Sequence, residues 1–446
     1  MPPLNRRDFI KIAGTGAVAS GAMGLMSAVS GTASAGALPD SFLNIPMQGN
    51  VRILHITDVH GQLFPVYFRE PNVNLGMGSA RGRIPHLVGK NLLDYAGIEP
   101  GGAEAYAYSY LDFDQASEKY GRMGGFANIK TLLDRLRGQA GGRENTLTLD
   151  GGDLWQGSAT SLWTRGVDMV EASNILGVDV MVGHWEFTYR EEEVLSNVAL
   201  FKGDFIGQNV KVKEDALFGD EYPALVERFD GRGLYDEDAG HAFQPYVIKN
   251  VNGAKICIIG QAFPRTANAN PQEFFPDWSF GLREDEMIEI VEQIRSDHQP
   301  DAIVLLSHNG MDVDVKMAER VPGLNAVFGG HTHDGMPKPL QVSNVDGGTC
   351  LVTNAGSNGK FVGVMDFDIG DNGVKSINYR MLPVFDNMLE PDPEMNAFLA
   401  QMRQTVYDEK VVESRKSQYF SNETRLGKTY DEILNEKLAI AGTTFY

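Results

Sequence analysis

Cysteine is scarce in this chain, because its 446 residues include only Cys257 and Cys350. Two cysteines cannot build a disulfide scaffold or a cluster of thiolate metal ligands. Basic residues are also few, with 39 lysines and arginines against 59 acidic residues and a formal net charge of −20. This balance argues against a nucleic acid or an anionic membrane as a partner. After residue 35 no run of about 18 apolar residues occurs, so we expect no membrane insertion.

Apolar residues are present in the proportion that a folded core needs. Hydrophobic residues make up 42% of the chain and aromatic residues 9%, which excludes a disordered chain. At roughly 100–200 residues per domain, the length alone suggests two domains, or one large domain with an appendage.

The first 35 residues have the pattern of an export signal. Arg6 and Arg7 precede a weakly apolar stretch rich in glycine and alanine, and Ala33-Ser34-Ala35 supplies a small-x-small cleavage site. A membrane-spanning helix is the alternative, but the stretch is short for a bilayer and its glycines weaken a helix. We therefore expect residues 1–35 to engage the twin-arginine translocase and to direct the chain to the periplasm.

From residue 51 onward, short apolar runs alternate with helical patterns, which is typical of a layered α/β domain. Helices are expected at 124–137 and 284–295, and a long polar, glycine-rich stretch from Gly61 to Met123 is expected to be a functional insertion. The expected strands are 51–57, 146–150, 178–182, 205–207, 255–260, 302–306, 326–328, 350–353 and 361–369.

The composition changes after about Pro383, where a helical pattern over 394–406 leads into a charged, polar tail. Sixty such residues do not form a second core. We expect one catalytic domain over residues 50–385. Residues 386–446 are expected to be a helical linker and the start of a second domain that this chain does not complete.

Five of the nine histidines stand in short polar clusters directly after predicted strands. The carboxyl ends of strands in an α/β sheet form the ligand-binding edge, so these clusters can converge in space. The clusters are Asp58-Val59-His60, Asp150-Gly-Gly-Asp153, Gly183-His184-Trp185-Glu186, Ser307-His308-Asn309 and Gly330-His331-Thr332-His333. The other histidines lack this context and are interpreted as structural: His55, His86, His241 and His298.

Imidazole and carboxylate groups without thiolates suit manganese, iron or zinc. The number of candidate ligands exceeds what one ion needs and suits two ions about 3.5–4 Å apart that share a carboxylate. Two divalent ions would attract an anionic substrate locally in spite of the acidic chain, and they would activate water at neutral pH. Phosphoryl and sulfonyl transfer both fit such a site.

These motifs resemble the calcineurin-like metallophosphoesterases, in their 5′-nucleotidase branch, and within it the thiosulfohydrolase family of the Sox pathway, SoxB. The resemblance implies a four-layer α/β/β/α sandwich, which is a mixed α/β fold. It spans roughly residues 50–385, and the longer stretches that carry it are 65–76, 155–160, 183–188, 277–281, 307–314 and 354–360.

The resemblance also implies the metal ligands. One ion would be held by Asp58, His60, Asp153 and His333. Asp153 would bridge to a second ion that is held by His184, His308 and His331. Relatives of this branch are associated with two manganese ions.

Asp153, His184 and Trp185 are the residues that the resemblance implies for catalysis. The general superfamily has Gly-Asn-His-Glu where this chain has Gly183-His184-Trp185-Glu186. His184 thus takes the place of an asparagine ligand, and Trp185 takes the place of a catalytic histidine. This substitution agrees with the thiosulfohydrolases and weakens the case for a general phosphomonoesterase.

The activity that the resemblance implies is release of sulfate from the cysteine S-thiosulfonate of the SoxYZ carrier protein. A narrow channel formed by the insertion would admit the carrier's flexible arm. Two alternatives stay open: a periplasmic 5′-nucleotidase or related phosphoesterase, and a truncated, non-catalytic metal-binding relative. Asn209 and Arg69 are weaker candidates for substrate contact, and Arg265 is left outside the site.

Overall fold

A computed structural model of the chain describes residues 40–67 and 76–406. The expected export signal over 1–35, Arg69 and the tail from residue 407 onward lie outside the described residues.

The first of two six-stranded sheets combines a parallel half with an antiparallel hairpin. Its strand order is β14-β13-β1-β2-β3-β4, and the pairs from β1 to β4 are parallel. The strands are β1 (Val51–Ile56), β2 (Thr146–Asp150), β3 (Val180–Met181), β4 (Asp204–Phe205), β13 (Phe361–Gly370) and β14 (Gly373–Pro383).

The second sheet has the order β11-β12-β10-β9-β7-β6, in which the four central strands are parallel. A separate two-stranded ribbon pairs β5 (Val210–Val212) with β8 (Trp278–Phe280). The strands of the second sheet are β6 (Tyr246–Val251), β7 (Ala254–Gln261), β9 (Ala302–Ser307), β10 (Ala326–Gly329), β11 (Leu340–Ser343) and β12 (Thr349–Asn354).

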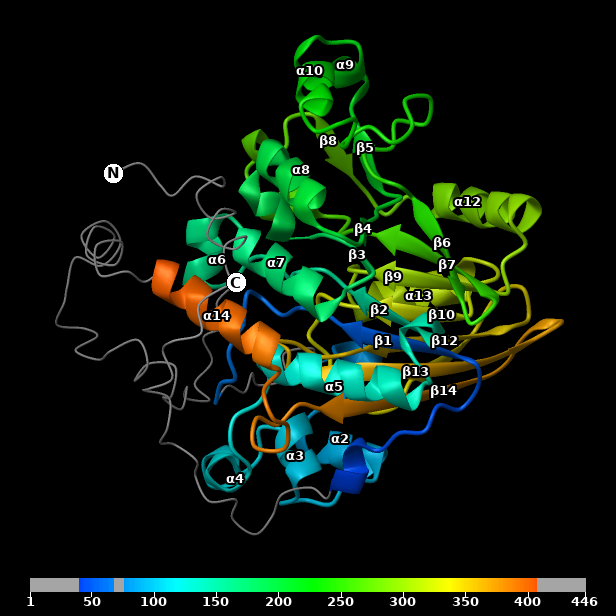
Figure 1. Ribbon diagram of the computed structural model, residues 1–446. Helices are drawn as coiled ribbons and strands as arrows, with labels where there is room; N and C mark the ends of the chain where they lie inside the picture. The colour runs from blue at the N-terminus through cyan, green and yellow to red at the C-terminus, as the bar shows by residue number, and fades with distance from the viewer. Residues whose placement is uncertain (1–39, 68–75, 407–446) are drawn as a thin grey trace.

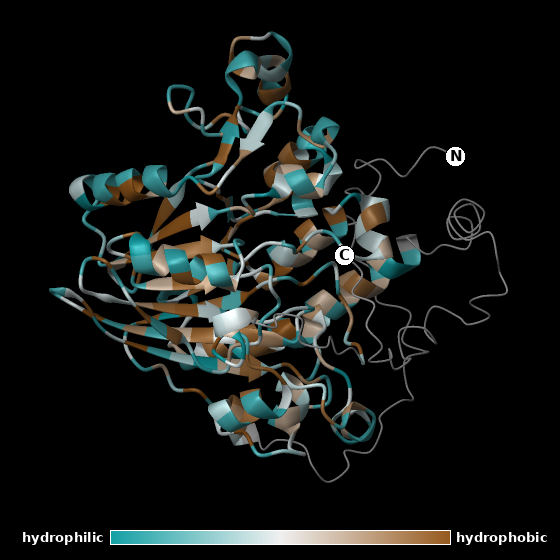
Figure 2. Cartoon of the chain, turned by 180° about the vertical axis from the view of Figure 1, so that it is seen from behind, coloured by the Kyte–Doolittle hydropathy of each residue, from teal (hydrophilic) through white to brown (hydrophobic). Residues whose placement is uncertain are grey.

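Three apolar clusters divide the molecule into layers, because successive side chains of a strand point to opposite faces. Ile53 and Ile258 belong to the cluster between the two sheets. Leu54, on the other face of β1, packs with a first helical layer, and Ile303 of β9 packs with a second one. In Figure 2 the hydrophobic colour gathers in the central strands. This arrangement confirms the predicted α/β/β/α sandwich.

The helices of the two outer layers lie at opposite faces of the sheet pair (Figure 1). The layer on the first sheet comprises α5 (Phe126–Gln139), α6 (Ala159–Thr164), α7 (Val167–Leu176), α8 (Glu191–Leu200) and α14 (Pro393–Val406). The layer on the second sheet comprises α12 (Glu284–Asp297) and α13 (Met311–Arg320). Shorter helices are α9 (Glu214–Leu217), α10 (Glu221–Glu227), α11 (Thr266–Ala269) and the 3₁₀ turn η4 (Trp185–Tyr189).

The insertion between Gly61 and Met123 forms a helical cluster of its own. It contains α2 (Gly89–Ala96), α3 (Ala103–Tyr108) and α4 (Phe113–Tyr120). These helices share an apolar cluster with the end of the β13–β14 hairpin. Tyr108 donates a hydrogen bond of 2.9 Å to the carbonyl of Met381, so the described part of the insertion is fastened to the first sheet.

The nine predicted strands are all present, but some boundaries differ. The strand expected at 178–182 is only Val180–Met181 long, since the amide of Val178 instead caps helix α7 by donating to the Ser173 carbonyl. The helix expected from residue 124 begins at Phe126, because Gly125 has a φ of +90°. No helix among the described residues is long and apolar enough to cross a membrane.

The helix predicted over 394–406 is α14, and it does more than connect. Met395, Leu399 and Met402 are buried in the apolar cluster of the first helical layer, and α14 contacts α5, α6 and α7. The helix is therefore part of the domain's outer layer.

Candidate metal centre

The structure brings all seven candidate metal ligands to one edge of the two sheets. Each ligand lies directly after the carboxyl end of a parallel strand, which is where ligand sites of α/β sheets form. Asp58 and His60 follow β1, Asp153 follows β2, His184 follows β3, His308 follows β9, and His331 and His333 follow β10.

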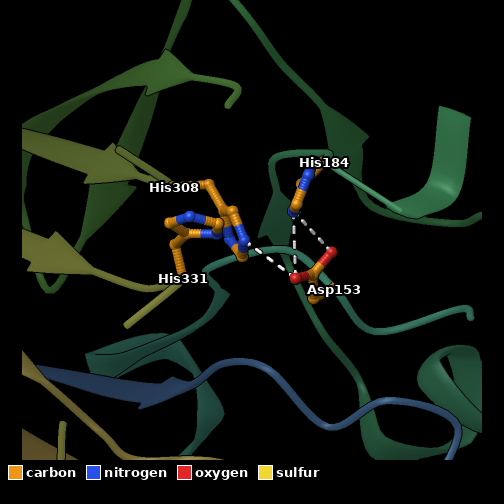
Figure 3. Close-up of side chains that lie close together, drawn as sticks. All are labelled: Asp153, His184, His308 and His331. Carbon is orange, nitrogen blue, oxygen red and sulfur yellow. Dashed lines mark hydrogen bonds and ion pairs between the residues drawn. The ribbon is translucent and has the colours of Figure 1, made fainter. Parts of the chain in front are cut away.

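The first donor cluster combines one carboxylate with three imidazoles. Asp153, His184, His308 and His331 each offer a ligand atom, and these atoms lie within 4.8 Å of one another. Figure 3 shows His184 and His308 directed at the Asp153 carboxylate from different loops. Nδ1 of His184 and Nε2 of His308 both lie 3.0 Å from Oδ2 of Asp153.

The second donor cluster contains Asp58, His60 and His333. The Nε2 atoms of His60 and His333 face each other at 2.9 Å, and Nε2 of His333 lies 3.4 Å from Oδ1 of Asp58. Two imidazole nitrogens that converge beside a carboxylate form a ready set of donors for one cation.

The two clusters are adjacent and form one centre. Nε2 of His60, in the second cluster, lies 3.8 Å from Oδ2 of Asp153, in the first. Conversely, Nε2 of His308 lies 3.7 Å from Oδ1 of Asp58. Asp153 thus faces histidines of both clusters, as a bridging carboxylate would.

Unusual backbone geometry accompanies the candidate ligands. Non-glycine residues rarely adopt a positive φ, and backbone strain of this kind tends to cluster at functional sites. Five of the seven candidate ligands have φ between +51° and +73°, namely Asp58, His60, Asp153, His331 and His333.

Gly330 lets the ligand loops of the two sheets meet. A Cβ atom at this position would lie 2.5 Å from Oγ1 of Thr57, 2.9 Å from Nδ1 of His308 and 3.0 Å from Oδ2 of Asp58. Any larger residue would therefore push the loops after β1, β9 and β10 apart.

The side chain of Glu186 connects two of the ligand loops, a role that its position in the sequence did not reveal. Its buried carboxylate accepts hydrogen bonds from the backbone amides of His184 and Leu154, at 2.9 and 2.7 Å, and from those of Asp153 and Trp155. Burial raises its pKa, against the lowering effect of these donors. One side chain thus joins the loops after β2 and β3.

Aromatic rings flank the first cluster. The ring of Trp185 lies 4.9 Å from that of His184, centroid to centroid, and its backbone amide donates a 2.7 Å hydrogen bond to Oδ1 of Asp153. Phe263, which the sequence did not single out, packs against His331 at 4.1 Å and His184 at 4.4 Å. These rings form an apolar wall beside the donors.

The electrostatics of the site favour a cation between the carboxylates. Burial alone would raise the pKa of Asp58, but the neighbouring His308 and His333 lower it to about 2. Burial would lower the pKa of His308, yet Asp153 and Asp58 outweigh this effect and raise it to about 10. For His331, burial and the neighbouring His308 and His184 outweigh the two carboxylates and lower its pKa to about 3.

The donor set fits two divalent ions. The described ligands are nitrogen and oxygen donors, their carboxylates are buried and ionised, and ring nitrogens converge on them from several loops. Hard to borderline metals prefer these donors. The clusters can therefore hold metal, and they divide the seven ligands as expected, with Asp153 at the junction.

The weaker candidates lie outside the donor clusters. Asn209 is buried, and its amide bridges two loops by donating to the carbonyls of Ala262 and Gly281 and accepting from the amide of Ala262. It is thus committed to a structural role. Arg265 is exposed. The four histidines interpreted as structural do not join either cluster: His55, His86, His241 and His298.

Comparisons with known proteins agree with this geometry. Residues 51–335 match the family model of the calcineurin-like phosphoesterases. The UshA protein of Yersinia enterocolitica is 26% identical over 293 residues, covering 58% of this chain and 48% of that protein. The 5′-nucleotidase of Rattus norvegicus is 25% identical, covering 63% and 47%. The chain thus spans about half the length of these curated relatives.

Among solved structures, the sulfate thiohydrolase SoxB of Thermus thermophilus is 30% identical with a TM-score of 0.70, covering 84% of this chain and 68% of that one. A 5′-nucleotidase precursor from the same organism is 20% identical with a TM-score of 0.57, which shows the shared fold. The chain therefore belongs to the calcineurin-like phosphoesterase family, in the SoxB-like part of its 5′-nucleotidase branch.

Proposed function

We propose that the chain is a dinuclear-metal hydrolase that releases sulfate from the cysteine S-thiosulfonate of a SoxYZ carrier protein. The observation that carries this proposal is Trp185, which stands beside the joined donor clusters where phosphoesterases have a catalytic histidine. The 30% identity to a sulfate thiohydrolase supports it.

Two divalent cations, with Mn²⁺ as the first choice, would supply an activated water and polarise the oxygens of a tetrahedral anion. Asp58, His60 and His333 would hold one cation, and His184, His308 and His331 the other. Asp153 would contact both. The backbone amide of Trp185 would keep the Asp153 carboxylate oriented through its 2.7 Å hydrogen bond.

The net reaction needs no strong proton donor for the leaving group. A water oxygen bonds to the sulfonate sulfur, and the bond between this sulfur and the sulfane sulfur breaks. Sulfate is released, the sulfane sulfur keeps the electron pair as the carrier's cysteine persulfide, and the two protons of the water pass to solvent. A persulfide is far more acidic than an alcohol, so a general acid contributes little to its departure. An indole at position 185 cannot act as that acid but can exclude water from the site.

A 5′-nucleotidase or related phosphoesterase activity is the second candidate. The curated relatives favour it, because they include UshA proteins and 5′-nucleotidases at 25–26% identity. Trp185 counts against it, since an alkoxide leaving group gains from protonation. A non-catalytic metal-binding role is the third possibility, and it would give carrier binding without turnover.

The place of action and the partner belong to the same proposal. Export by the twin-arginine translocase would deliver the folded chain to the periplasm. There the insertion, which is joined to β14 by Tyr108 and to α13 by His86, would line a channel for the carrier arm.

The test compares two substrates under identical metal loading. The Mn²⁺-loaded chain is incubated with thiosulfonate-loaded SoxYZ and, separately, with AMP. The proposal predicts that sulfate release is much faster than phosphate release. Faster phosphate release would favour the nucleotidase, and stoichiometric carrier binding without either product would favour the non-catalytic role.

A further inference from the structure

Asp314 is a buried carboxyl group that the proposed chemistry does not use. It lies in the first turn of α13, next to the strand ends that precede His308 and His331, and its exposed fraction is 0%. It belongs to neither donor cluster. Its contacts show what it does to those strand ends.

The first contact is with the end of β9, on both sides of His308. Oδ1 of Asp314 accepts a 2.6 Å hydrogen bond from the hydroxyl of Ser307 and a 3.3 Å bond from the side-chain amide of Asn309. The Ser307 hydroxyl in turn accepts from the Asn309 backbone amide at 3.1 Å. Asp314 thus brackets the residue that lies between them, His308.

The second contact is with the end of β10, which carries His331. Gly329 approaches Asp314 so closely that a Cβ atom at this glycine would lie 2.4 Å from Oδ2. Oδ2 has no hydrogen-bond partner within the described part of the chain. The amide of Met311, at the start of the same helix, donates to Oγ1 of Thr332 at 3.3 Å. The start of α13 therefore rests on both ligand-bearing loops.

A capping role does not account for these contacts. The cap residue of α13 is Gly310, which has no side-chain cap bond. The Asp314 carboxylate bonds to side chains of the β9 loop rather than to free amides of its own helix. Asn309 continues the contact to Gln261, whose amide donates to its Oδ1 at 3.1 Å, so a buried polar chain runs from α13 across the end of β9 to β7.

We infer that Asp314 is a positioning residue for the metal ion of the Asp153 cluster. It fixes the separation of His308 and His331, two of the four ligands in the Asp153 cluster, and its own side chain makes no described contact with Asp58, His60 or His333. The inference rests on the proposed metal centre. Groups that orient ligands in this way change metal affinity by about 10–100-fold when removed.

Mn²⁺ titration of the metal-free full chain, with the free ion counted by electron paramagnetic resonance, tests this directly. The wild-type chain is expected to bind two ions. Asp314→Ala is expected to bind one of them about 10–100-fold more weakly and the other unchanged. Asp314→Asn keeps the acceptor atom for Ser307 and is expected to stay within about threefold of wild type.

Two other aspartates provide matched controls. Asp312→Ala removes an exposed carboxylate from the same helix, one that pairs with His86. Asp168→Ala removes a buried carboxyl group from α7 that bonds to Thr164. Both variants are expected to bind two ions with wild-type affinity. This result would separate the loss of the Asp314 contacts from the loss of any buried or nearby acid.

Gly329→Ala approaches the same contact from the other side. Its methyl group would displace the Asp314 side chain, so this variant is expected to bind the same ion more weakly. Asp314→Ala removes the nearer of the two oxygens that this methyl group would meet, at 2.4 Å against 3.0 Å for the Thr353 carbonyl. The double variant should therefore bind this ion only slightly more weakly than Asp314→Ala does, a clear departure from additivity.

The outcomes separate this inference from the proposal it rests on. A wild-type chain that fails to bind two ions contradicts the metal centre itself. Suppose instead that the wild-type chain binds two ions. If Asp314→Ala then binds both as well as the wild type does, or loses both equally, only the positioning role of Asp314 is overturned. An Asp314→Asn variant that binds the ion as weakly as Asp314→Ala also overturns the positioning role, because the hydrogen bond from Ser307 would then not be the cause of the tighter binding.

Discussion

Single residues at the strand ends carry most of the information about this site. Asp58 and His333 could be predicted as ligands because a strand pattern precedes each of them and the donor types match one class of metal. Glu186 and Phe263 could not be predicted in their roles. Glu186 acts on amides of the β2 loop, more than 30 positions earlier, and Phe263 touches His331 and His184 only after the sheets have packed.

The residue-scale prediction concerns Trp185. Replacing it by histidine places a proton donor where a phosphoesterase has one, and general acids typically contribute 10²–10⁴-fold. Trp185→His should therefore raise hydrolysis of a phosphomonoester such as p-nitrophenyl phosphate by about tenfold or more in the Mn²⁺-loaded chain.

Trp185→Phe is the matched control, because it opens the same wall without adding a proton donor. It should give no comparable gain. If Trp185→His is folded and metal-loaded yet no faster than Trp185→Phe, then Trp185 only packs beside the donors, and the acidity of the leaving group does not explain why a tryptophan stands there.

At the scale of elements, Glu191 shows how one carboxyl group ties a helix to a ribbon. At the start of α8, it accepts hydrogen bonds from the amides of Asp277 and Trp278 at 2.8 and 3.1 Å. Trp278 then donates to the hydroxyl of Tyr222. Phe187, three residues after His184, packs on Trp278 at 5.7 Å. The α8–β8 contact thus supports the loop of a candidate ligand.

This contact predicts a pH dependence of stability. Burial raises the pKa of Glu191 from 4.5 to about 8, with Asp277 adding to the shift against the backbone donors. Between these values the folded chain holds a proton that the unfolded chain releases, so the free energy of unfolding falls as pH rises from about 4.5 to 8. Glu191→Gln keeps the acceptor oxygen and removes the proton.

Denaturant unfolding of both chains at pH 5 and pH 8 measures this effect. The stability of Glu191→Gln relative to wild type should rise by about 2 kcal/mol or more between the two pH values, since one pKa unit corresponds to about 1.4 kcal/mol. Parallel pH profiles for the two chains would show that Glu191 does not hold the proton.

The elements also show where sequence patterns reach their limit. Buried central strands such as β9 and β7 could be predicted from the sequence, because both of their faces are apolar. The edge strands β6, β11 and β14 expose much of their surface, and their mixed patterns did not predict strands. Strand order could not be read either, since it depends on which apolar faces pack together.

The whole molecule explains why the metal centre needs both sheets. Its candidate ligands run from Asp58 to His333, and Asp153 of the first sheet lies 3.0 Å from His308 of the second. The apolar layer between the sheets holds these halves together. Each donor cluster combines ligands from both sheets, so neither metal position can form from one sheet alone.

The most direct test follows sulfate release from thiosulfonate-loaded SoxYZ while Mn²⁺ is returned stepwise to the chelated chain. A hydrolase that needs two ions should release sulfate at no more than about half of its full rate at one equivalent, and should reach the full rate only at two. Full activity at one equivalent, or none at any loading while AMP is hydrolysed, would contradict a two-metal thiosulfohydrolase.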